Sequence, residues 1–285
     1  MKQLDWDFAA IPLIILLTQN NLISIGMKKF GLIGFPLGHS FSKKYFTEKF
    51  EKEGLTDYSY ELLPLENISD VQELITANPE LLGLNVTIPH KIGIMFYLDK
   101  VTPEAKAIDA VNCIKIINQK PVESFFTGEF TSMKVRLEGH NTDAFGFEAS
   151  LKPLLKKHHN KALVLGNGGA ARAVSYVLEK LDIDFKIVSR KPGRKQIKYT
   201  QVDESLMKDH LLIINTTPLG MSPDISTCPD IPYEKITDRH ILYDLVYNPA
   251  ETEFLKRGKE KGALIKNGEE MLHLQAEKAW EIWNS

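Results

Sequence analysis

The sequence lacks a surplus of basic charge, and this absence argues against two classes of partner. Its 35 lysines and arginines are balanced by 37 aspartates and glutamates, so the formal net charge is -2. Proteins that bind nucleic acid or anionic membrane surfaces carry clustered positive charge. We therefore expect neither nucleic acid nor a membrane among the partners of this protein.

Cysteine is scarce as well. The chain has two, Cys113 and Cys228, which are too few for a disulfide framework and too isolated for a thiolate zinc site. The adjacent histidines His158 and His159 also lack ligand spacing, and we predict that they face solvent. These observations predict no metal site and a reducing, cytoplasmic location.

The N-terminus has no apolar run long enough to cross a membrane. Residues 8–17 are apolar but are interrupted by Pro12, whereas a transmembrane helix needs about 20 residues. Aspartates precede this run, and a secretory signal would need a basic start and a small-residue cleavage site. Met27 directly precedes a strand-like segment and is an alternative start, so we interpret residues 1–26 as an N-terminal appendage outside the working chain.

The remaining chain is long enough for about two domains, at roughly 150 residues per domain. From Lys28 onward, strand-like and helix-like runs alternate, which indicates an α/β fold. A polar segment near residues 150–160 separates two series of strands, and we predict domains over 27–150 and 151–268. Helices are predicted over residues 42–53, 69–77, 145–155 and 269–283.

Two smaller features complete this organisation. Residues 118–133 lie between two predicted strands and are expected to form a long hairpin excursion. Trp280 and Trp283 lie on the apolar side of the last predicted helix, where packing is a more common role than nucleotide binding.

A glycine turn in the second domain is the strongest local signal for a ligand. A strand-like run enters Gly166, Asn167, Gly168, Gly169 and Ala170, after which apolar residues recur at helical spacing. Such a turn lets the backbone approach a pyrophosphate, and the N-terminus of the helix favours negative charge. The pattern is GxGGA and not the full GxGxxG, so a simple turn is the alternative. We favour phosphate binding.

The residues after the next strand bear on the choice of cofactor. This strand ends at Ser189 and is followed by Arg190, Lys191 and Arg194. An acidic residue at this place would bind the ribose of NAD, whereas arginine accommodates the additional phosphate of NADP. The basic cluster therefore favours NADP, and a solvated basic loop is the alternative.

Polar residues follow the predicted strands of the first domain. Ser40 and Ser42 lie at the start of a predicted helix, where two hydroxyls and free N–H groups suit a carboxylate, although one serine could simply cap the helix. Asn85, Thr87 and Asn112 offer neutral donors and acceptors suited to sugar-like hydroxyls.

Lys91 and Asp143 could carry acid–base chemistry. Asp143 alone is more typical of a helix cap. If the two groups converge on a polyhydroxy ring, one can give or take a proton at the reacting oxygen while the other positions it.

From Met27 to the C-terminus, the sequence resembles shikimate dehydrogenases. The motifs that carry the resemblance occur in the family's order: GFPLGHSFS, NVTIPHK, AVN, GHNTD, GNGGA, SRK, NTTPLGM, YDLVYNPAETEFL and NGEEMLHLQA. The resemblance implies an N-terminal α/β substrate-binding domain, completed by a C-terminal helix over 269–285, and a Rossmann-like NADP-binding domain. The active site would lie in the cleft between them.

The resemblance also implies an activity. It is the reversible NADPH-dependent reduction of 3-dehydroshikimate to shikimate in the biosynthesis of chorismate and aromatic amino acids. Lys91 and Asp143 would be the catalytic pair, and Ser40 and Ser42 would hold the substrate carboxylate. The ring hydroxyls would be bound by Asn85, Thr87, Asn112 and Gln275, with Tyr247 lining the substrate site. The NADP site would include Thr216, Leu245 and Gly268, the last bordering the nicotinamide.

The sequence departs from the family's pattern in the length of the 118–133 segment, in a short C-terminal extension and at two of its motifs. Lys43 to Phe46 stand where the family usually has Pro-x-x-His-Asn, so we expect that helix to pack differently while the serines keep their role. Lys191 replaces a common threonine and preserves positive charge.

Two alternatives to this activity stay open, a quinate/shikimate dehydrogenase that uses NAD and a non-catalytic NADP-binding regulator. The intact pair of Lys91 and Asp143 favours the enzyme. The protein is expected to be a monomer or a homodimer.

Overall fold

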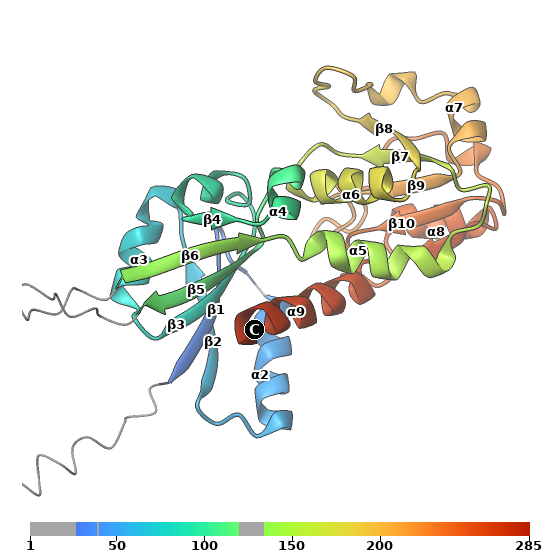
Figure 1. Ribbon diagram of the computed structural model, residues 1–285. Helices are drawn as coiled ribbons and strands as arrows, with labels where there is room; N and C mark the ends of the chain where they lie inside the picture. Colours follow the sequence, from blue (N-terminus) through green and yellow to red (C-terminus); the bar gives the residue numbers. More distant parts are fainter. Residues whose placement is uncertain (1–26, 39, 120–133) are drawn as a thin grey trace, which may run out of the picture.

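The computed structural model describes residues 27–38, 40–119 and 134–285. The proposed appendage, residues 1–26, and residues 120–133 of the expected excursion lie outside the described residues. Within the described ranges, the chain forms two α/β units, each built around its own sheet, and Figure 1 shows them side by side. In the same ranges, no helix combines the length and the apolar character needed to cross a membrane.

The first unit contains a six-stranded mixed sheet in the order β2-β1-β3-β5-β6-β4. Its strands are β1 (Lys28–Gly34), β2 (Tyr58–Pro64), β3 (Leu81–Val86), β4 (Lys100–Val101), β5 (Cys113–Gln119) and β6 (Lys134–His140). β1 pairs in parallel with β2 and β3, whereas β5 is antiparallel to both β3 and β6. The pairing of Gln119 with Lys134 brings together the two ends of the expected excursion and confirms the hairpin.

Five helical segments connect these strands. They are α2 (Phe41–Glu53), α3 (Val71–Ala77), α4 (Pro103–Ile108) and the 3-10 helices η2 (Ile68–Asp70) and η3 (Gly93–Tyr97). The helix predicted over 69–77 is therefore a 3-10 turn followed by α3. Ser40 and Thr102 cap α2 and α4 by accepting hydrogen bonds from backbone N–H groups three residues ahead.

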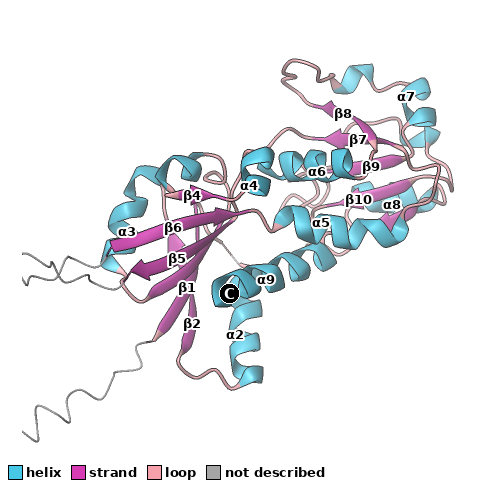
Figure 2. Cartoon of the chain, in the orientation of Figure 1, coloured by secondary structure: helices cyan, strands magenta, loops and turns pink. Residues whose placement is uncertain are grey.

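The second unit contains a five-stranded parallel sheet in the order β11-β10-β9-β7-β8. Its strands are β7 (Lys161–Leu165), β8 (Asp184–Val188), β9 (Leu212–Asn215), β10 (Ile241–Asp244) and β11 (Leu264–Lys266). The helices are α6 (Gly169–Lys180), α7 (Glu204–Asp209), α8 (Glu253–Glu260), η5 (Tyr199–Gln201) and η6 (Tyr233–Lys235). Figure 2 shows helices on both sides of this sheet, as its almost continuously apolar central strands require.

The chain order of the second sheet reverses at β7, which has β8 on one side and β9 on the other. Ligands of open α/β sheets bind outside the carboxyl ends of the strands at such a switch point. The glycine turn that begins at Gly166 follows β7 directly, so the fold places it where a nucleotide would bind.

Two further helices join the units. They are α5 (Asp143–Leu151), continued by the 3-10 turn η4 (Lys152–Leu154), and α9 (Glu269–Asn284). Figure 1 shows α9 (red) running from the second unit back to the first sheet. There the ring of Trp283 stacks on Phe30 with centroids 4.8 Å apart, and its Nε1 donates to the carbonyl of Ile114 at 3.0 Å. The packing role predicted for Trp280 and Trp283 is confirmed.

Two expectations need correction. The helix predicted over 145–155 starts at Asp143 and changes to 3-10 geometry after Leu151, where Pro153 follows. The prediction that His159 faces solvent is wrong, because the side chain is buried with 5% exposure. Its Nδ1 accepts a hydrogen bond from the N–H of Lys156, and its Nε2 bonds the carbonyl of Arg239. Burial lowers the pKa of His159, so it is a neutral structural link between a connector and the second sheet.

Candidate functional site

A cavity of about 500 Å³ lies between the two units and gathers the expected substrate site. It is bounded by the ends of β1 and β3, the start of α2, the loop after β10 and one turn of α9. Every residue expected to bind substrate or to catalyse lines it: Ser40, Ser42, Asn85, Thr87, Lys91, Asn112, Asp143, Tyr247 and Gln275. The fold therefore brings together residues from both ends of the sequence.

Lys91 and Asp143 form a direct ion pair in this cavity. The distance from Lys91 Nζ to Asp143 Oδ2 is 2.6 Å, and the side chains are 18% and 11% exposed. The other carboxylate oxygen accepts a hydrogen bond from Asn112 Nδ2 at 2.9 Å. Asn141 Oδ1 accepts the N–H of Ala144 in the first turn of α5. Since Asn141 serves that turn, the side chain of Asp143 is available to hold the lysine.

The side-chain amides that line the cavity are held by hydrogen bonds, some of them from residues that do not line it themselves. Tyr60 on β2 donates from its hydroxyl to Asn85 Oδ1 at 2.7 Å, and Asn85 Nδ2 donates to the carbonyl of Asn112 at 3.4 Å. Thr142 Oγ1 connects Asn112 Nδ2, at 3.0 Å, to Gln275 Oε1 at 3.3 Å. Burial raises the pKa of Tyr60 well above its usual range, so this phenol stays a neutral donor. Sequence reasoning missed Tyr60, since a tyrosine in a strand carries no motif.

The two serines stand at the start of α2. Ser40 Oγ accepts the N–H of Lys43 at 3.4 Å, so this residue caps the helix and also lines the cavity. Lys43 Nζ is bonded to Glu61 Oε2 at 2.9 Å. Phe46 is fully buried and stacks on Tyr60 with centroids 4.7 Å apart. Apolar packing at Phe46 thus accompanies the departure from the family's usual motif, while the serines keep their place.

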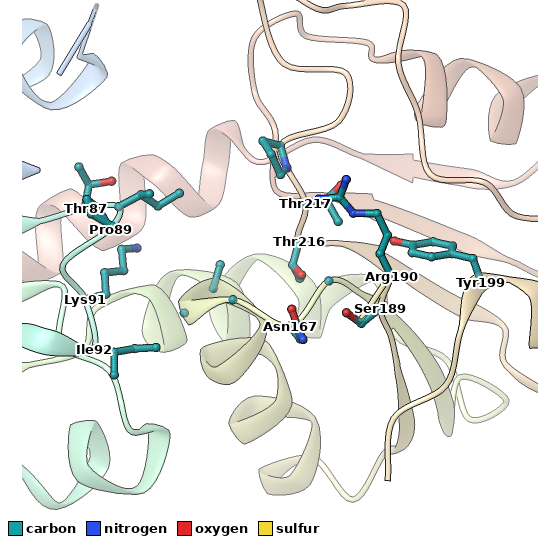
Figure 3. Close-up of a pocket in the computed structure, with 16 residues that line it drawn as sticks. Thr87, Pro89, Lys91, Ile92, Asn167, Ser189, Arg190, Tyr199, Thr216 and Thr217 are labelled. Carbon is teal, nitrogen blue, oxygen red and sulfur yellow. The ribbon is translucent and has the colours of Figure 1, made fainter. Parts of the chain in front are cut away.

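A second cavity, of about 470 Å³, contains the glycine turn (Figure 3). The expected cofactor residues that line it are Gly166, Asn167, Gly168, Gly169, Ala170, Ser189, Arg190 and Thr216. Sequence reasoning did not identify Tyr199, which lies on η5, or assign Thr217 and Pro218, neighbours of the named Thr216. In Figure 3, Lys91 lies at one end of this cavity, and Arg190 and Tyr199 lie at the other.

The glycine turn fits a phosphate group on steric grounds. Gly166 has φ +114°, and a Cβ there would lie 2.6 Å from Thr216 Oγ1. A Cβ on Gly168 would meet nothing within 4 Å, so this face of the turn is open to the cavity. Gly168 is the N-cap residue of α6 and offers no side-chain cap, which leaves the first N–H groups of that helix for a ligand.

Four expected cofactor residues do not line this cavity in the structure: Lys191, Arg194, Leu245 and Gly268. Gly268 packs against the carbonyl of Leu245, where a side chain would not fit, and its N–H donates to the carbonyl of Val246 at 3.1 Å. Lys191 is near the turn through its carbonyl, which Asn167 Nδ2 approaches at 3.5 Å. In the described ranges, no three His, Cys, Asp or Glu side chains are grouped as metal ligands would be.

The two cavities meet at three residues that line both of them, Thr87, Ile88 and Lys91. Lys91 therefore stands where the contents of the two cavities would touch. This arrangement can bring a proton donor next to the reacting atoms of two separate ligands.

Comparisons with known proteins agree with this geometry. The family model for the shikimate dehydrogenase substrate binding domain matches residues 32–114. The shikimate dehydrogenase (NADP(+)) of Methanococcus aeolicus is 35% identical, over 92% of this chain and 94% of the relative. That of Methanocaldococcus jannaschii is 36% identical, over 92% and 93%. The shikimate 5-dehydrogenase of Thermus thermophilus, solved in complex with NADP(H) and shikimate, superposes with a TM-score of 0.75 at 31% identity and covers 90% of this chain and 93% of its own.

Proposed function

The chain belongs to the shikimate dehydrogenase family, and from this premise we propose how its own residues perform the reaction. It is an NADP-dependent oxidoreductase that acts on a CH–OH group, and it reduces 3-dehydroshikimate to shikimate reversibly, within aromatic biosynthesis. The observation that carries the proposal is the position of Lys91, which lines both cavities and is paired with Asp143 at 2.6 Å.

Lys91 is the proton donor for reduction. When bound, NADPH supplies the hydride that reaches the carbonyl carbon of the substrate. The ammonium of Lys91 then gives a proton to the carbonyl oxygen, and in the reverse direction the same group takes the proton from the hydroxyl. Asp143 holds the ammonium in place, and Asn112 fixes the carboxylate through its other oxygen.

The substrate is held by the side chains of the first cavity. Ser40 and Ser42 at the start of α2 bind the substrate carboxylate, aided by the N-terminal end of the helix. The ring hydroxyls are bound by Asn85, Thr87, Asn112 and Gln275, and Tyr247 closes the opposite wall.

The cofactor is held mainly by backbone groups of the second unit. The turn from Gly166 to Ala170 and the first N–H groups of α6 bind the pyrophosphate. Ser189 and Arg190 bind the additional phosphate of NADP, with Lys191 and Arg194 adding positive charge. Thr216 also borders the cofactor, while Leu245 and Gly268 lie outside the second cavity.

The proposal also includes the domain boundaries, the cellular location and the oligomeric state. Residues 27–150, together with the C-terminal helix over 269–285, form the substrate-binding domain, and residues 151–268 bind NADP. The protein acts in the cytoplasm as a monomer or a homodimer, which sedimentation of the purified chain would distinguish.

The test follows the formation of NADPH by its optical absorbance. Purified protein is assayed with shikimate or quinate as substrate and with NADP or NAD as cofactor. We expect turnover with shikimate and NADP, at a higher kcat/KM than with either replacement. Tight NADP binding without turnover on any pair would contradict the proposal and favour a regulator. A higher kcat/KM with quinate and NAD would favour the alternative dehydrogenase.

A further inference from the structure

A group of buried polar side chains lies behind the cleft, at the carboxyl ends of two neighbouring strands of the second sheet. Asp244 ends β10 and Asn215 ends β9, and the two residues are paired in the sheet register. Asp244, Asn215 and Thr252 each have 0% exposure. None of the three lines either cavity, so none of them can contact the ligands directly.

Asp244 accepts hydrogen bonds at both carboxylate oxygens. Oδ1 accepts from Asn215 Nδ2 at 2.9 Å and from the N–H of Val246 at 3.0 Å. Oδ2 accepts from Thr252 Oγ1 at 2.6 Å, next to the start of α8. All three partners are neutral donors, and Asp244 has no ion-pair partner within the described part of the chain.

The bond to Asn215 leads to the loop that borders the NADP cavity. Asn215 Oδ1 accepts from the N–H and the Oγ1 of Thr217, at 3.0 Å and 2.7 Å. Its Nδ2 also donates to the carbonyl of Leu219 at 3.4 Å. Residues 216–218 of this loop line the NADP cavity, and Met221 lines the substrate cavity.

The bond to Val246 leads to the loop after β10. The carbonyl of Val246 accepts the N–H of Gly268, just before α9, at 3.1 Å. The next residue, Tyr247, lines the substrate cavity, and its ring meets that of Phe41 on α2 with centroids 6.0 Å apart. One oxygen of Asp244 is therefore hydrogen-bonded toward two of the loops of the second unit that border the cavities.

We propose that Asp244 is a positioning residue, which sets the loops 216–221 and 245–247 against each other so that the NADP and substrate cavities keep their shape together. The inference rests on the proposed function. A buried carboxylate without an ion-pair partner is costly, and a well-packed apolar residue would serve stability better. Unlike an apolar residue, Asp244 can accept hydrogen bonds from Asn215 and Val246 at the same oxygen.

The test compares three variants of the full-length protein in the shikimate and NADP assay. Asp244→Ala removes both loop bonds, and we expect the KM values for shikimate and for NADP each to rise about fivefold or more, the scale of about 1 kcal/mol for a lost buried acceptor. The fall in kcat at saturation should be smaller, because Lys91 and Asp143 belong to the other unit.

Two variants separate positioning from general stability. Asp244→Asn keeps an oxygen for Asn215 and Val246 and turns an NH2 group toward Thr252, so it should recover KM values within about twofold of the wild type. Thr252→Val preserves the shape of the side chain and leaves both bonds at Oδ1 in place. It removes the bond at Oδ2 and the N-cap hydrogen bond that Thr252 Oγ1 accepts from the N–H of Leu255 at 3.4 Å. It should lower the melting temperature while leaving both KM values within about twofold of the wild type.

The outcomes are distinct. If Asp244→Ala loses stability but keeps both KM values, or if Asp244→Asn is as impaired as Asp244→Ala, the inference is wrong. If Asp244→Ala does not fold, Asn215→Ala cuts only the link to the loop 216–221, and it must then raise the KM for NADP more than the KM for shikimate. Absence of activity in the wild type would instead refute the proposed function, which keeps the two failures apart.

Discussion

The two cavities of this protein are built from different kinds of group, side chains in the substrate cavity and backbone in the NADP cavity. The substrate cavity is lined by polar side chains that hold one another, as Asn112 holds Asp143 and Tyr60 holds Asn85. The NADP cavity is centred on backbone, with the glycine turn after β7 and the uncapped start of α6. The comparison teaches that the substrate site depends on which side chains are present, whereas the cofactor site depends on conformation and on the absence of side chains.

The largest effect is expected from removing Lys91, the charged residue among the three that line both cavities. Lys91→Ala should lower kcat by at least about 100-fold, the scale of lost acid–base catalysis, with a smaller effect on KM. Steady-state rates with shikimate and NADP measure both constants. Lys44→Ala is the matched control, because Lys44 is an exposed lysine paired only with Glu48 at 3.8 Å among the described residues. Near-normal kcat in Lys91→Ala would remove its catalytic role.

A second prediction concerns Asp244, the buried aspartate that the second unit holds through neutral donors. Burial raises the pKa of Asp244 to about 6, above the value of about 3.9 expected in the unfolded chain. The folded state then binds a proton that the unfolded state has released, so this contribution to stability is present at low pH and is lost as the pH rises through about 6.

Asp244→Asn cannot titrate at this position. Its free energy of unfolding, relative to the wild type, should therefore increase by about 2 kcal/mol between about pH 4 and pH 7. Urea denaturation of both proteins at the two pH values measures the difference. A difference that does not change with pH would show that the carboxyl group is not shifted by burial.

The backbone character of the NADP site is tested by adding one methyl group. Gly166→Ala places a Cβ at φ +114° and 2.6 Å from Thr216 Oγ1, so we expect the KM for NADP to rise about tenfold while the KM for shikimate changes less. Gly54→Ala is the matched control. It also places an alanine at positive φ, +67°, but with nothing within 4 Å of the added Cβ and at the end of α2, far from the cleft.

This control should cost about 1 kcal/mol of stability and leave both KM values unchanged. Equal KM values for NADP in the wild type and in Gly166→Ala would mean that the turn does not approach the cofactor.

The smallest expected effect tests whether the substrate cavity depends on side chains that hold one another. Tyr60→Phe removes the donor to Asn85 Oδ1, and we expect the KM for shikimate to rise about fivefold, from about 1 kcal/mol, with the KM for NADP unchanged. Tyr58→Phe is the control on the same strand, because the Tyr58 hydroxyl bonds only Lys28 Nζ among the described residues. If both variants have the same KM for shikimate, Tyr60 does not position Asn85.

Much of the site could be read from local patterns, for reasons that differ between residues. The glycine turn, the serines at the start of α2 and the basic cluster after β8 each depend on neighbours close in the chain. The structure places Gly166, Ser40 and Arg190 in the expected cavities. The family motifs also placed Gln275 and Tyr247 in the substrate cavity, although both lie far from Lys91 in the sequence.

Other features had no local signal. Tyr60 reaches Asn85 because β2 and β3 flank β1, and nothing in its own strand marks it. His159 is buried, with its ring nitrogens bonded to backbone groups of two segments that lie far apart in the sequence. Lys191 and Arg194 carry the expected charge but do not line the cavity.

The sequence by itself determined the α/β alternation, the turn at the end of β7 and the chemical groups that the reaction needs, because these depend on residue type and short-range spacing. Only the tertiary structure decided which polar groups meet. Lys91 and Asp143, 52 positions apart, are joined at 2.6 Å, and the sheet register sets Asp244 beside Asn215. The physical reason is that a hydrogen bond or an ion pair requires atoms to lie within about 3 Å, and between distant residues this proximity is created by strand order and helix packing, not by the local sequence.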